Sequence, residues 1–284
     1  MNDPRFTQPS AVPGLDLESL EIDLLLEAAY RRWGYDFRDY ARATVRRRVN
    51  ALMQSTNLTS ISAMIPVLLR EQELFLRLVG ALSVTVTELF RDPNFYKSIR
   101  ENVVPPLETY AFFKVWHAGC ATGEEAYSMA ILLEEAGLLD RAQIHATDMN
   151  QGSLKKAREA IYPLDAMNGG QANYLKSGGR GAFNDYYHAR YNAAQLIPRL
   201  IDNLTFSAHN LACDAVFGEM NVIVCRNVLI YFNRQLKERV LSMFHDSLCH
   251  RGFLCLGTQE TLEFSSFRDK FEVISSAQSI YRKL

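Results

Sequence analysis

A glycine-containing turn between a strand pattern and a helix pattern constrains this fold more than any other feature of the sequence. Residues 112–116 form an apolar strand pattern, Gly119 and Gly123 occupy the turn that follows, and helical periodicity covers residues 124–135. A second strand pattern, at residues 143–148, comes next. Strand and helix patterns that alternate in this way are typical of βαβ units. We therefore expect an α/β domain with a doubly wound, mainly parallel sheet.

The chain before this region has a different pattern, with apolar residues spaced for helices over residues 17–33 and 39–53. No long period-two alternation occurs there, so we expect an all-α module of about four helices. Because the composition changes after Asp92, we expect the domain boundary at that point. The predicted organisation is a disordered lead-in over residues 1–15, a helical domain over 16–92 and an α/β domain over 93–284.

The alternation is interrupted at residues 163–203, which contain glycine pairs and a tyrosine-rich run at residues 186–191. About forty irregular residues would be unusual as pure loop in an α/β domain. We expect a small inserted antiparallel β-subdomain over residues 163–203. A surface loop is the alternative, and the aromatic content argues against it. The remaining patterns predict strands at 204–207, 221–225 and 252–257, a helix at 234–249, and a terminal hairpin from 271–274 and 279–282.

Composition and charge limit the partners and the compartment. Lys and Arg total 31 against 32 Asp and Glu, a net charge of -1, which gives no support for general binding of polyanions. Apolar runs such as residues 253–256 are too short to span a bilayer, so membrane insertion is not expected. Five widely spaced cysteines without a C-x-x-C motif predict reduced thiols in the cytoplasm. Cysteines and histidines lack metal-site spacing, so no metal is expected.

The glycine turn also indicates a ligand. Gly119 and Gly123 would let a ligand approach the backbone closely, and the helix that begins at Glu124 would offer unpaired N–H groups. Asp148 follows about 25 positions later, at the end of the second strand, where an acid can accept hydrogen bonds from ribose hydroxyls. These residues favour a nucleoside-containing ligand. Two structural glycines and a helix-capping Asp are the alternative.

Two carboxylates at the start of the helix, Glu124 and Glu125, distinguish between nucleoside ligands. Their simplest explanation is that they complement the helix dipole. They would nevertheless repel a pyrophosphate and attract a ligand that carries an ammonium group and a cationic sulfur. S-adenosylmethionine is therefore favoured over NAD, and an NAD-dependent dehydrogenase is the weaker alternative.

Strings of residues in four places resemble one family. They are S-V-T-V-T-E-L-F-R at residues 83–91, G-C-A-T-G-E-E-A-Y-S at 119–128, A-T-D at 146–148 and C-R-N-V-L-I-Y-F at 225–232. From about residue 20 to its end, the sequence is similar to the CheR family of chemotaxis-receptor glutamate methyltransferases. The resemblance implies a Rossmann-like methyltransferase domain that binds S-adenosylmethionine and releases S-adenosylhomocysteine.

The resemblance also implies which residues bind the methyl donor. Glu125 would hold the methionine ammonium, and Asp148 would bind the ribose. The full implied set is Thr85, Thr87, Arg91, Gly119, Gly123, Glu125, Asp148, Asn210, Leu211, Asn227 and Val228. The sequence departs from the family at several positions: Thr85 stands where the family has Asn, and Thr258-Gln259 stand where it usually has His-Ser.

A glutamate that attacks a sulfonium methyl group needs no general base, because its carboxylate is already ionised at neutral pH. The enzyme then has to align the two groups and exclude water. We expect Arg91 to bind the substrate carboxylate and Tyr231 to hold one of its oxygens, as the catalytic pair. Chemistry alone leaves a surface ion pair for Arg91 and a core position for Tyr231 as alternatives, and the family resemblance favours the catalytic roles.

A basic helix face indicates the macromolecular substrate. Its arginines are Arg42, Arg46, Arg47 and Arg48. We expect them to bind the glutamate-bearing cytoplasmic helices of a chemoreceptor or receptor-like protein by electrostatic attraction. A solvated helix face is the alternative. In some members of the family the inserted subdomain binds a receptor's C-terminal peptide, so the resemblance suggests a second contact here.

Two further functions remain as alternatives. The first is a signalling or scaffold protein that binds S-adenosylmethionine or S-adenosylhomocysteine with little or no turnover, suggested by Thr85 and Thr258-Gln259. The second is a nucleic-acid methyltransferase that uses the arginine cluster. The near-neutral net charge and the absence of interleaved aromatic residues argue against nucleic acid as a partner.

Overall fold

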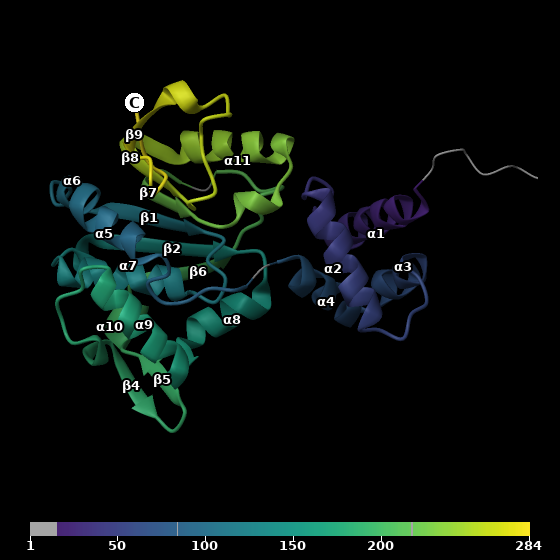
Figure 1. Ribbon diagram of the computed structural model, residues 1–284, viewed down its shortest axis with the longest axis horizontal. Helices are drawn as coiled ribbons and strands as arrows, with labels where there is room; N and C mark the ends of the chain where they lie inside the picture. Colours follow the sequence, from purple (N-terminus) through teal and green to yellow (C-terminus); the bar gives the residue numbers. More distant parts are fainter. Residues whose placement is uncertain (1–15, 84, 217) are drawn as a thin grey trace, which may run out of the picture. The chain divides into compact units, whose positions relative to one another are not determined.

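The computed structural model describes residues 16–83, 85–216 and 218–284, and the disordered lead-in predicted over residues 1–15 lies outside them. The described chain forms two compact units (Figure 1). A helical unit comprises residues 16–38 and 42–82, and an α/β unit comprises residues 39–41 together with the chain from Ser83 onward. Residues 39–41 belong to the α/β unit, in which Tyr40 forms an isolated bridge with Phe232.

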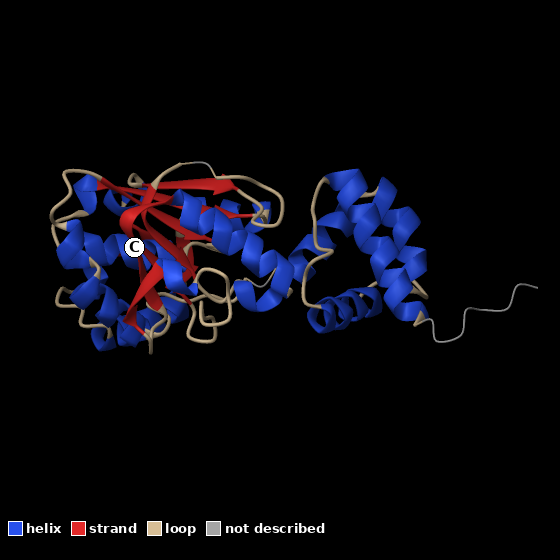
Figure 2. Cartoon of the chain, turned by 90° about the horizontal axis from the view of Figure 1, so that it is seen from above, coloured by secondary structure: helices blue, strands red, loops and turns tan. Residues whose placement is uncertain are grey.

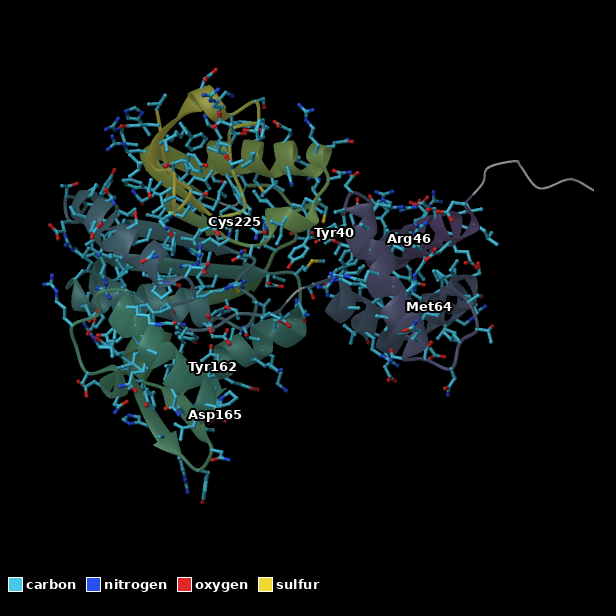
Figure 3. All side chains as sticks on the ribbon, in the orientation of Figure 1. Tyr40, Arg46, Met64, Tyr162, Asp165 and Cys225 are labelled. Carbon is cyan, nitrogen blue, oxygen red and sulfur yellow. The ribbon has the colours of Figure 1, made fainter. Side chains whose placement is uncertain are left out.

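The helical periodicity near the N-terminus produces the expected all-α unit. Its helices are α1 (Leu17–Trp33), α2 (Arg42–Gln54), α3 (Ile61–Arg70) and α4 (Gln72–Leu82). The Asp16 carboxylate caps α1 by accepting a hydrogen bond from the Ser19 N–H, and Gly34 ends the helix with a left-handed φ of 79°. Apolar side chains such as Leu25 and Met64 are fully buried between the helices, and Figure 3 labels Met64.

The α/β unit is built on a seven-stranded sheet in the order β6-β2-β1-β7-β8-β10-β9. Its strands are β1 (Phe113–Ala118), β2 (Ala142–Asp148), β6 (Leu204–Ala208), β7 (Met220–Cys225), β8 (Leu248–Leu256), β9 (Phe271–Ser275) and β10 (Ile280–Lys283). The first five in the sheet order pair in parallel, whereas β8, β10 and β9 pair antiparallel. The expected doubly wound sheet and terminal hairpin are both confirmed.

The winding direction of the sheet reverses between β1 and β7. From β1 the chain passes through α7 (Glu124–Glu135) and α8 (Gln151–Glu159) towards β6, and from β7 it passes through α11 (Arg234–Ser247) to β8. Figure 1 shows α7 and α8 on one side of the sheet and α11 on the other, and Figure 2 shows the strands lying among helices. A reversal of this kind leaves a crevice at the carboxyl ends of the two strands, where ligands bind in open α/β sheets.

Shorter helices complete the α/β unit. They are α5 (Pro93–Asn102), α6 (Val104–Leu107) and the 3-10 turns η1 (Leu139–Arg141), η3 (Leu229–Tyr231) and η4 (Arg268–Lys270). In α5, Phe95, Tyr96 and Ile99 are fully buried in the same core as Val115 of β1. This packing attaches the chain that precedes β1 firmly to the sheet.

The insertion between β2 and β6 contains the expected antiparallel sheet, with strand order β3-β5-β4. Its elements are β3 (Ile161–Pro163), α9 (Leu164–Lys176), η2 (Phe183–Tyr186), β4 (Tyr187–Arg190), β5 (Ala193–Leu196) and α10 (Pro198–Ile201). Figure 3 labels Tyr162 of β3 and Asp165 of α9. The helix α9 was not expected from the sequence, and the first strand starts at Ile161, before the expected start of the insertion.

Helix α9 contains two adjacent glycines, and one of them, Gly170, packs closely against the segment before α5. A Cβ atom at Gly170 would lie 2.8 Å from the Cβ of Leu89, closer than real Cβ atoms approach. At Gly169 a Cβ would meet nothing within 4 Å. Two tyrosines of the insertion, Tyr174 and Tyr186, are buried, and the Tyr174 ring contacts Phe90 and Phe183, whereas Tyr191 is exposed. The Gly169–Gly170 pair therefore marks a close helix contact, whereas the Gly178–Gly179 pair lies in the turn that follows α9.

The boundary between the two units differs from the expected one. The division follows Leu82, so the expected boundary after Asp92 lies inside the α/β unit. The physical reason is burial: Leu89 and Phe90 belong to the hydrophobic core of the α/β unit. The Phe90 N–H also donates to the Ser128 hydroxyl of α7, at 2.8 Å. Residues 85–92 thus fold with the sheet that follows them.

Two smaller expectations can be compared with the structure. All five cysteines are free thiols. Within the described residues, no helix has the length and apolar character needed to cross a bilayer.

The contact between α9 and Leu89 predicts opposite effects for two adjacent substitutions. Gly170→Ala should lower the free energy of unfolding by about 1–3 kcal/mol, because the new methyl group overpacks against Leu89. Gly169→Ala should raise the same quantity by about 0.5–1 kcal/mol, because it gains helix propensity without a clash. Urea unfolding of both variants measures the difference. Equal stability of the two variants would contradict the close contact.

Candidate functional site

A cavity of about 400 Å³ lies in the α/β unit at the carboxyl ends of β1, β7 and β8. Its volume is within the range of small-molecule binding sites. It therefore occupies the crevice that the reversal of strand order leaves open. The loop that follows Cys225, the last residue of β7 labelled in Figure 3, forms one of its walls.

Seven of the residues predicted from the sequence line this single cavity. They are Thr87, Arg91, Gly119, Glu125, Asn227, Val228 and Tyr231. They come from the segment before α5, the turn after β1, the first turn of α7 and the loop after β7. The fold thus gathers residues from distant parts of the sequence at one edge of the sheet.

The turn after β1 depends on glycine at one cavity-lining position. Gly119 has a φ of 79°, and a Cβ atom there would lie 2.6 Å from Val228 Cγ2. The N–H groups of Gly119 and Cys120 both donate to the Thr147 carbonyl, at 2.8 and 2.9 Å. Any larger residue at position 119 would push the turn away from the loop after β7.

Gly123 has a different position from Gly119. It is the N-cap of α7 with a φ of 96°, and a Cβ atom there would lie 3.0 Å from the Cβ of Ala157 in α8. Gly123 does not line the cavity. Its backbone conformation closes the turn onto the helix, so its contribution to the site is to direct α7 away from the sheet edge.

Asp148 stabilises the turn after β1 by hydrogen bonding to its backbone. Its carboxylate accepts hydrogen bonds from the Ala121 N–H, at 2.9 Å, and from the Asn150 N–H, at 2.8 Å. Burial raises the pKa of Asp148, and these amide hydrogen bonds oppose the shift. Asp148 is not among the residues that line the cavity. The carboxylate instead fixes Ala121, which does line it and has a φ of 48°.

Glu125 belongs to a buried cluster of charges in the cavity wall. Its carboxylate lies 3.1 Å from Arg226 Nη1 and 3.1 Å from His117 Nδ1. The Arg226 side chain is only 1% exposed, and its other terminal nitrogen lies 2.6 Å from an Asp92 oxygen. The guanidinium also lies over the Phe95 ring, 4.0 Å from its centroid. One arginine therefore joins two acids from different parts of the chain.

This cluster determines the charge state of Glu125. Burial alone would raise the pKa of its carboxyl group, but the His117 ring and the Arg226 guanidinium together hold that pKa below its ordinary value. Glu125 is therefore ionised at neutral pH even though it lies in the wall of a buried crevice.

Arg91 and Tyr231 present polar groups to the same cavity. The Arg91 guanidinium donates to the Val86 carbonyl at 3.0 Å and forms no ion pair within the described residues. Tyr231 ends the η3 turn, and its hydroxyl has no hydrogen-bond partner in the described part of the chain. Both groups thus remain available to a bound molecule.

Three other predicted residues lie outside the cavity lining. Thr85 is exposed in the segment before α5. Asn210 uses its side-chain oxygen to accept the Ala212 N–H, at 3.0 Å, and Leu211 is buried behind that turn. These two residues shape the loop after β6, and their predicted donor contacts remain a prediction.

Several residues that line or support the cavity were not assigned a role from the sequence. Additional lining residues are Val86, Asp92, Cys120, Ala121, Arg226, Ile230, Thr258 and Gln259. Arg226 directly follows the apolar strand pattern of β7, and the buried Glu260 lies four residues after the end of β8. A charged residue soon after an apolar strand was the available signal, because the carboxyl ends of parallel strands meet at one edge.

The arginine cluster belongs to the helical unit, and most of its charge is paired there. Arg42 pairs with Asp23 at 2.5 Å, and Arg46 pairs with Asp16 and Glu18. Arg48 donates to the Ala81 carbonyl, at 2.7 Å. Arg47 is exposed and has no side-chain partner within the described residues. The predicted basic surface is therefore less positive than the count of arginines suggests.

The residues present fit S-adenosylmethionine. The left-handed Gly119 leaves the backbone open to close approach, and an ionised carboxylate, Glu125, lines the same cavity with a charge that would attract an ammonium group. Arg226 keeps that carboxylate charged without exposing its own side chain. An acid, a glycine turn and a tyrosine hydroxyl that has no partner among the described residues therefore line one cavity.

Comparisons with known proteins agree with this site. Residues 85–280 match the family described as CheR methyltransferase, SAM binding domain, and residues 20–83 match the CheR methyltransferase all-alpha domain. The two matches meet at the boundary between the α/β unit and the helical unit. S-adenosylmethionine is therefore the cofactor of the α/β unit.

Relatives match the chain over nearly its whole length. A protein named Cher3 from Pseudomonas putida is 47% identical over 264 residues, which is 93% of this chain and 97% of the relative. A chemotaxis protein methyltransferase of Vibrio cholerae is 30% identical, over 87% of this chain and 90% of the relative. Another, of Vibrio parahaemolyticus, is 29% identical over 97% and 99%. Given this coverage and the matched domains, the chain belongs to the CheR methyltransferase family.

Proposed function

We propose that this chain transfers the methyl group of S-adenosylmethionine to glutamate side chains on cytoplasmic helices of a chemoreceptor or receptor-like protein, giving γ-methyl esters. The observation that carries the proposal is the shared lining of one cavity by Glu125, Arg91 and Tyr231. Relatives named chemotaxis protein methyltransferases support this substrate class.

The donor would be held by the turn after β1 and by the buried acids. Glu125 would attract the methionine ammonium, because Arg226 and His117 keep its carboxylate ionised. Asp148 would bind the ribose while it accepts the Ala121 N–H. When bound, S-adenosylmethionine supplies a methyl group on a cationic sulfur, which an anion can take up directly.

The acceptor would be held by Arg91 and Tyr231. A glutamate carboxylate is ionised at neutral pH, so no residue of this chain has to remove a proton from it. The Arg91 guanidinium would attract the carboxylate into the cavity, and the Tyr231 hydroxyl would donate to one oxygen, leaving the other free. Both groups orient the acceptor, and the surrounding wall excludes water.

Two other surfaces would contribute to recognition of the receptor. Arg47 offers the unpaired charge of the predicted arginine cluster, and Arg42, Arg46 and Arg48 would need to exchange their internal partners to assist it. The strand β4 of the insertion is mostly exposed and lies at an edge of its sheet. A receptor's C-terminal peptide could add to that edge as a further strand.

A second candidate function is favoured by one observation. Thr258 and Gln259 line the cavity at the position where the family usually has His-Ser. A protein that binds the donor for signalling or as a scaffold, with little or no turnover, would tolerate such a change. Transfer of a labelled methyl group separates this candidate from the enzyme.

Methyl transfer gives a direct test of the proposed function. With S-adenosylmethionine labelled in its methyl group, the full chain should label a chemoreceptor cytoplasmic fragment. Mild base should then release the label as methanol, because the bond is an ester. Replacement of the acceptor glutamates by Asp should abolish labelling. Label that survives base, or donor binding without any label on receptors, would contradict glutamate methylation.

Arg91→Ala should lower turnover about a hundredfold while changing the affinity for S-adenosylhomocysteine by less than about threefold. The reason is that the acceptor loses its charge-assisted contact, whereas the donor, for which Arg91 is only one of the expected contacts, keeps Glu125 and the turn at Gly119. Steady-state kinetics and calorimetry measure the two quantities. Arg268→Ala, which removes an exposed arginine 3.5 Å from Glu263, is the matched control and should leave both unchanged.

Arg226→Met should lower the free energy of unfolding by about 3–5 kcal/mol at neutral pH, because it leaves Glu125 buried without its cation. The folded-state pKa of Glu125 is depressed, so the stability from this pair exists above the unfolded pKa and is lost as pH falls. The difference between wild type and variant should therefore shrink on acidification. Urea unfolding across pH measures it.

The control for this prediction is Arg199→Met, at a half-exposed arginine that pairs with Glu134. Surface pairs contribute at most about 1 kcal/mol, so this variant should remain close to wild type. A difference for Arg226→Met that stays constant with pH would show that packing on Phe95, rather than charge pairing, is the source of the stability.

A further inference from the structure

One buried carboxylate near the cavity has a hydrogen-bonding role that the reaction does not explain. Glu260 follows β8 and is only 5% exposed. Its Oε2 atom accepts the N–H groups of Asn227, at 3.0 Å, and Gly257, at 2.6 Å. Its Oε1 atom accepts those of Val228, at 2.9 Å, and Ile230, at 3.2 Å. A single side chain thus satisfies backbone amides in the loops after two adjacent strands.

The arrangement requires an ionised carboxylate. A carboxylate offers about four lone-pair sites and no donor, and here four N–H groups use them. An amide of the same shape would direct an NH₂ group at two of these donors. Hydrogen bonds to ionised groups are also stronger than neutral ones. Neither Gln nor a protonated acid can therefore replace this group.

The neighbouring residues are adapted to the close approach of this carboxylate. A Cβ atom at Gly257 would lie 2.7 Å from Glu260 Oε2 and 2.9 Å from the Asn227 nitrogen. The Glu260 N–H donates to the Gly257 carbonyl at 2.8 Å, and the Ser279 hydroxyl donates to the Glu260 carbonyl at 2.9 Å. Glu260 is thus fixed by hydrogen bonds of its own backbone as well as by the amide N–H groups that donate to its carboxylate.

The loop that Glu260 holds is the wall of the cavity. Asn227 has a left-handed φ of 60°, which is unusual for a residue other than glycine. Val228 follows it and lies against Gly119 on the opposite wall. Asn227, Val228 and Tyr231 all line the cavity, whereas Glu260 does not. The carboxylate therefore acts on the cavity only through the backbone of this loop.

We propose that Glu260 is a positioning residue, whose carboxylate holds the 226–231 loop in the conformation that binds the methyl donor. Without it, the buried N–H group of Gly257 and three partly buried N–H groups would lose their partner, and the left-handed Asn227 would relax towards the ordinary region. Val228 would then move away from Gly119, and the cavity would lose one wall. The inference concerns the donor site and is independent of which acceptor is methylated.

Glu260→Gln tests the proposal in the free protein and with S-adenosylhomocysteine. Hydrogen–deuterium exchange should be faster in the peptide that contains residues 226–231, and unchanged in peptides from the inserted sheet. Affinity for S-adenosylhomocysteine, measured by calorimetry, should fall about ten- to a hundredfold. In turnover, the KM for S-adenosylmethionine should rise, while the KM for the protein substrate stays the same.

Glu263→Gln is the matched control, because Glu263 is an exposed acid in the same segment. It should leave exchange, affinity and both KM values at wild-type levels. A role of Glu260 in overall stability alone would lower the midpoint of urea unfolding without changing the KM for S-adenosylmethionine under folding conditions. That result would overturn the proposal, as would unchanged exchange in the loop.

A second variant keeps the test valid if Glu260→Gln does not fold. Gly257→Ala retains the carboxylate but displaces it, because the new methyl group would overlap Oε2. It should reproduce the faster exchange of the loop and the weaker affinity for S-adenosylhomocysteine. Failure of both variants to fold would show that the carboxylate is a folding requirement, and the positioning role would be rejected.

Discussion

In the loops that follow the carboxyl ends of parallel strands, backbone N–H groups have no neighbouring strand to bond with. The need to satisfy these N–H groups determines how the loops around the cavity are held. Buried carboxylates satisfy these amides. Asp148 accepts amides from the turns after β1 and β2, and Glu260 accepts amides from the loops after β7 and β8. Each acid joins two loops, so the loops keep their relative positions without a regular hydrogen-bond ladder.

The charged groups of the cavity follow from the same arrangement. Once the loops are held, Arg226 lies between Asp92 and Glu125, and its charge balances two acids that would otherwise be costly to bury. The result is a cavity lined by an ionised carboxylate, by the Arg91 guanidinium and by the Tyr231 hydroxyl; among the described residues the guanidinium has no ion-pair partner and the hydroxyl no hydrogen-bond partner. A site of this kind can hold a cationic donor and an anionic acceptor together, which is what methylation of a carboxylate requires.

Much of this could be predicted from the sequence, and the limits have physical reasons. The alternation of strand and helix patterns and the glycine turn at Gly119 are local features, so they were visible, whereas the left-handed φ of Gly119 is known only from the structure. The helix α9 was not, because Gly169 and Gly170 lower helix propensity, and only the contact with Leu89 explains the second glycine. The role of Glu260 was hidden because its four partners are backbone amides, which have no side-chain signature. Predicted charge on the helical unit was overestimated, because pairing of Arg46 with Asp16 and Glu18 depends on tertiary packing.

The contact between Gly170 and Leu89 also limits how the insertion can change in evolution or by design. Leu89 is two residues from Arg91, and the Asn173 side chain donates to the Leu89 carbonyl at 3.3 Å. In a chimera that exchanged only the insertion, a helix from another relative would have to pack against Leu89, in the segment that carries Arg91. Exchange of the insertion between relatives therefore requires residues 86–91 to be exchanged together with it.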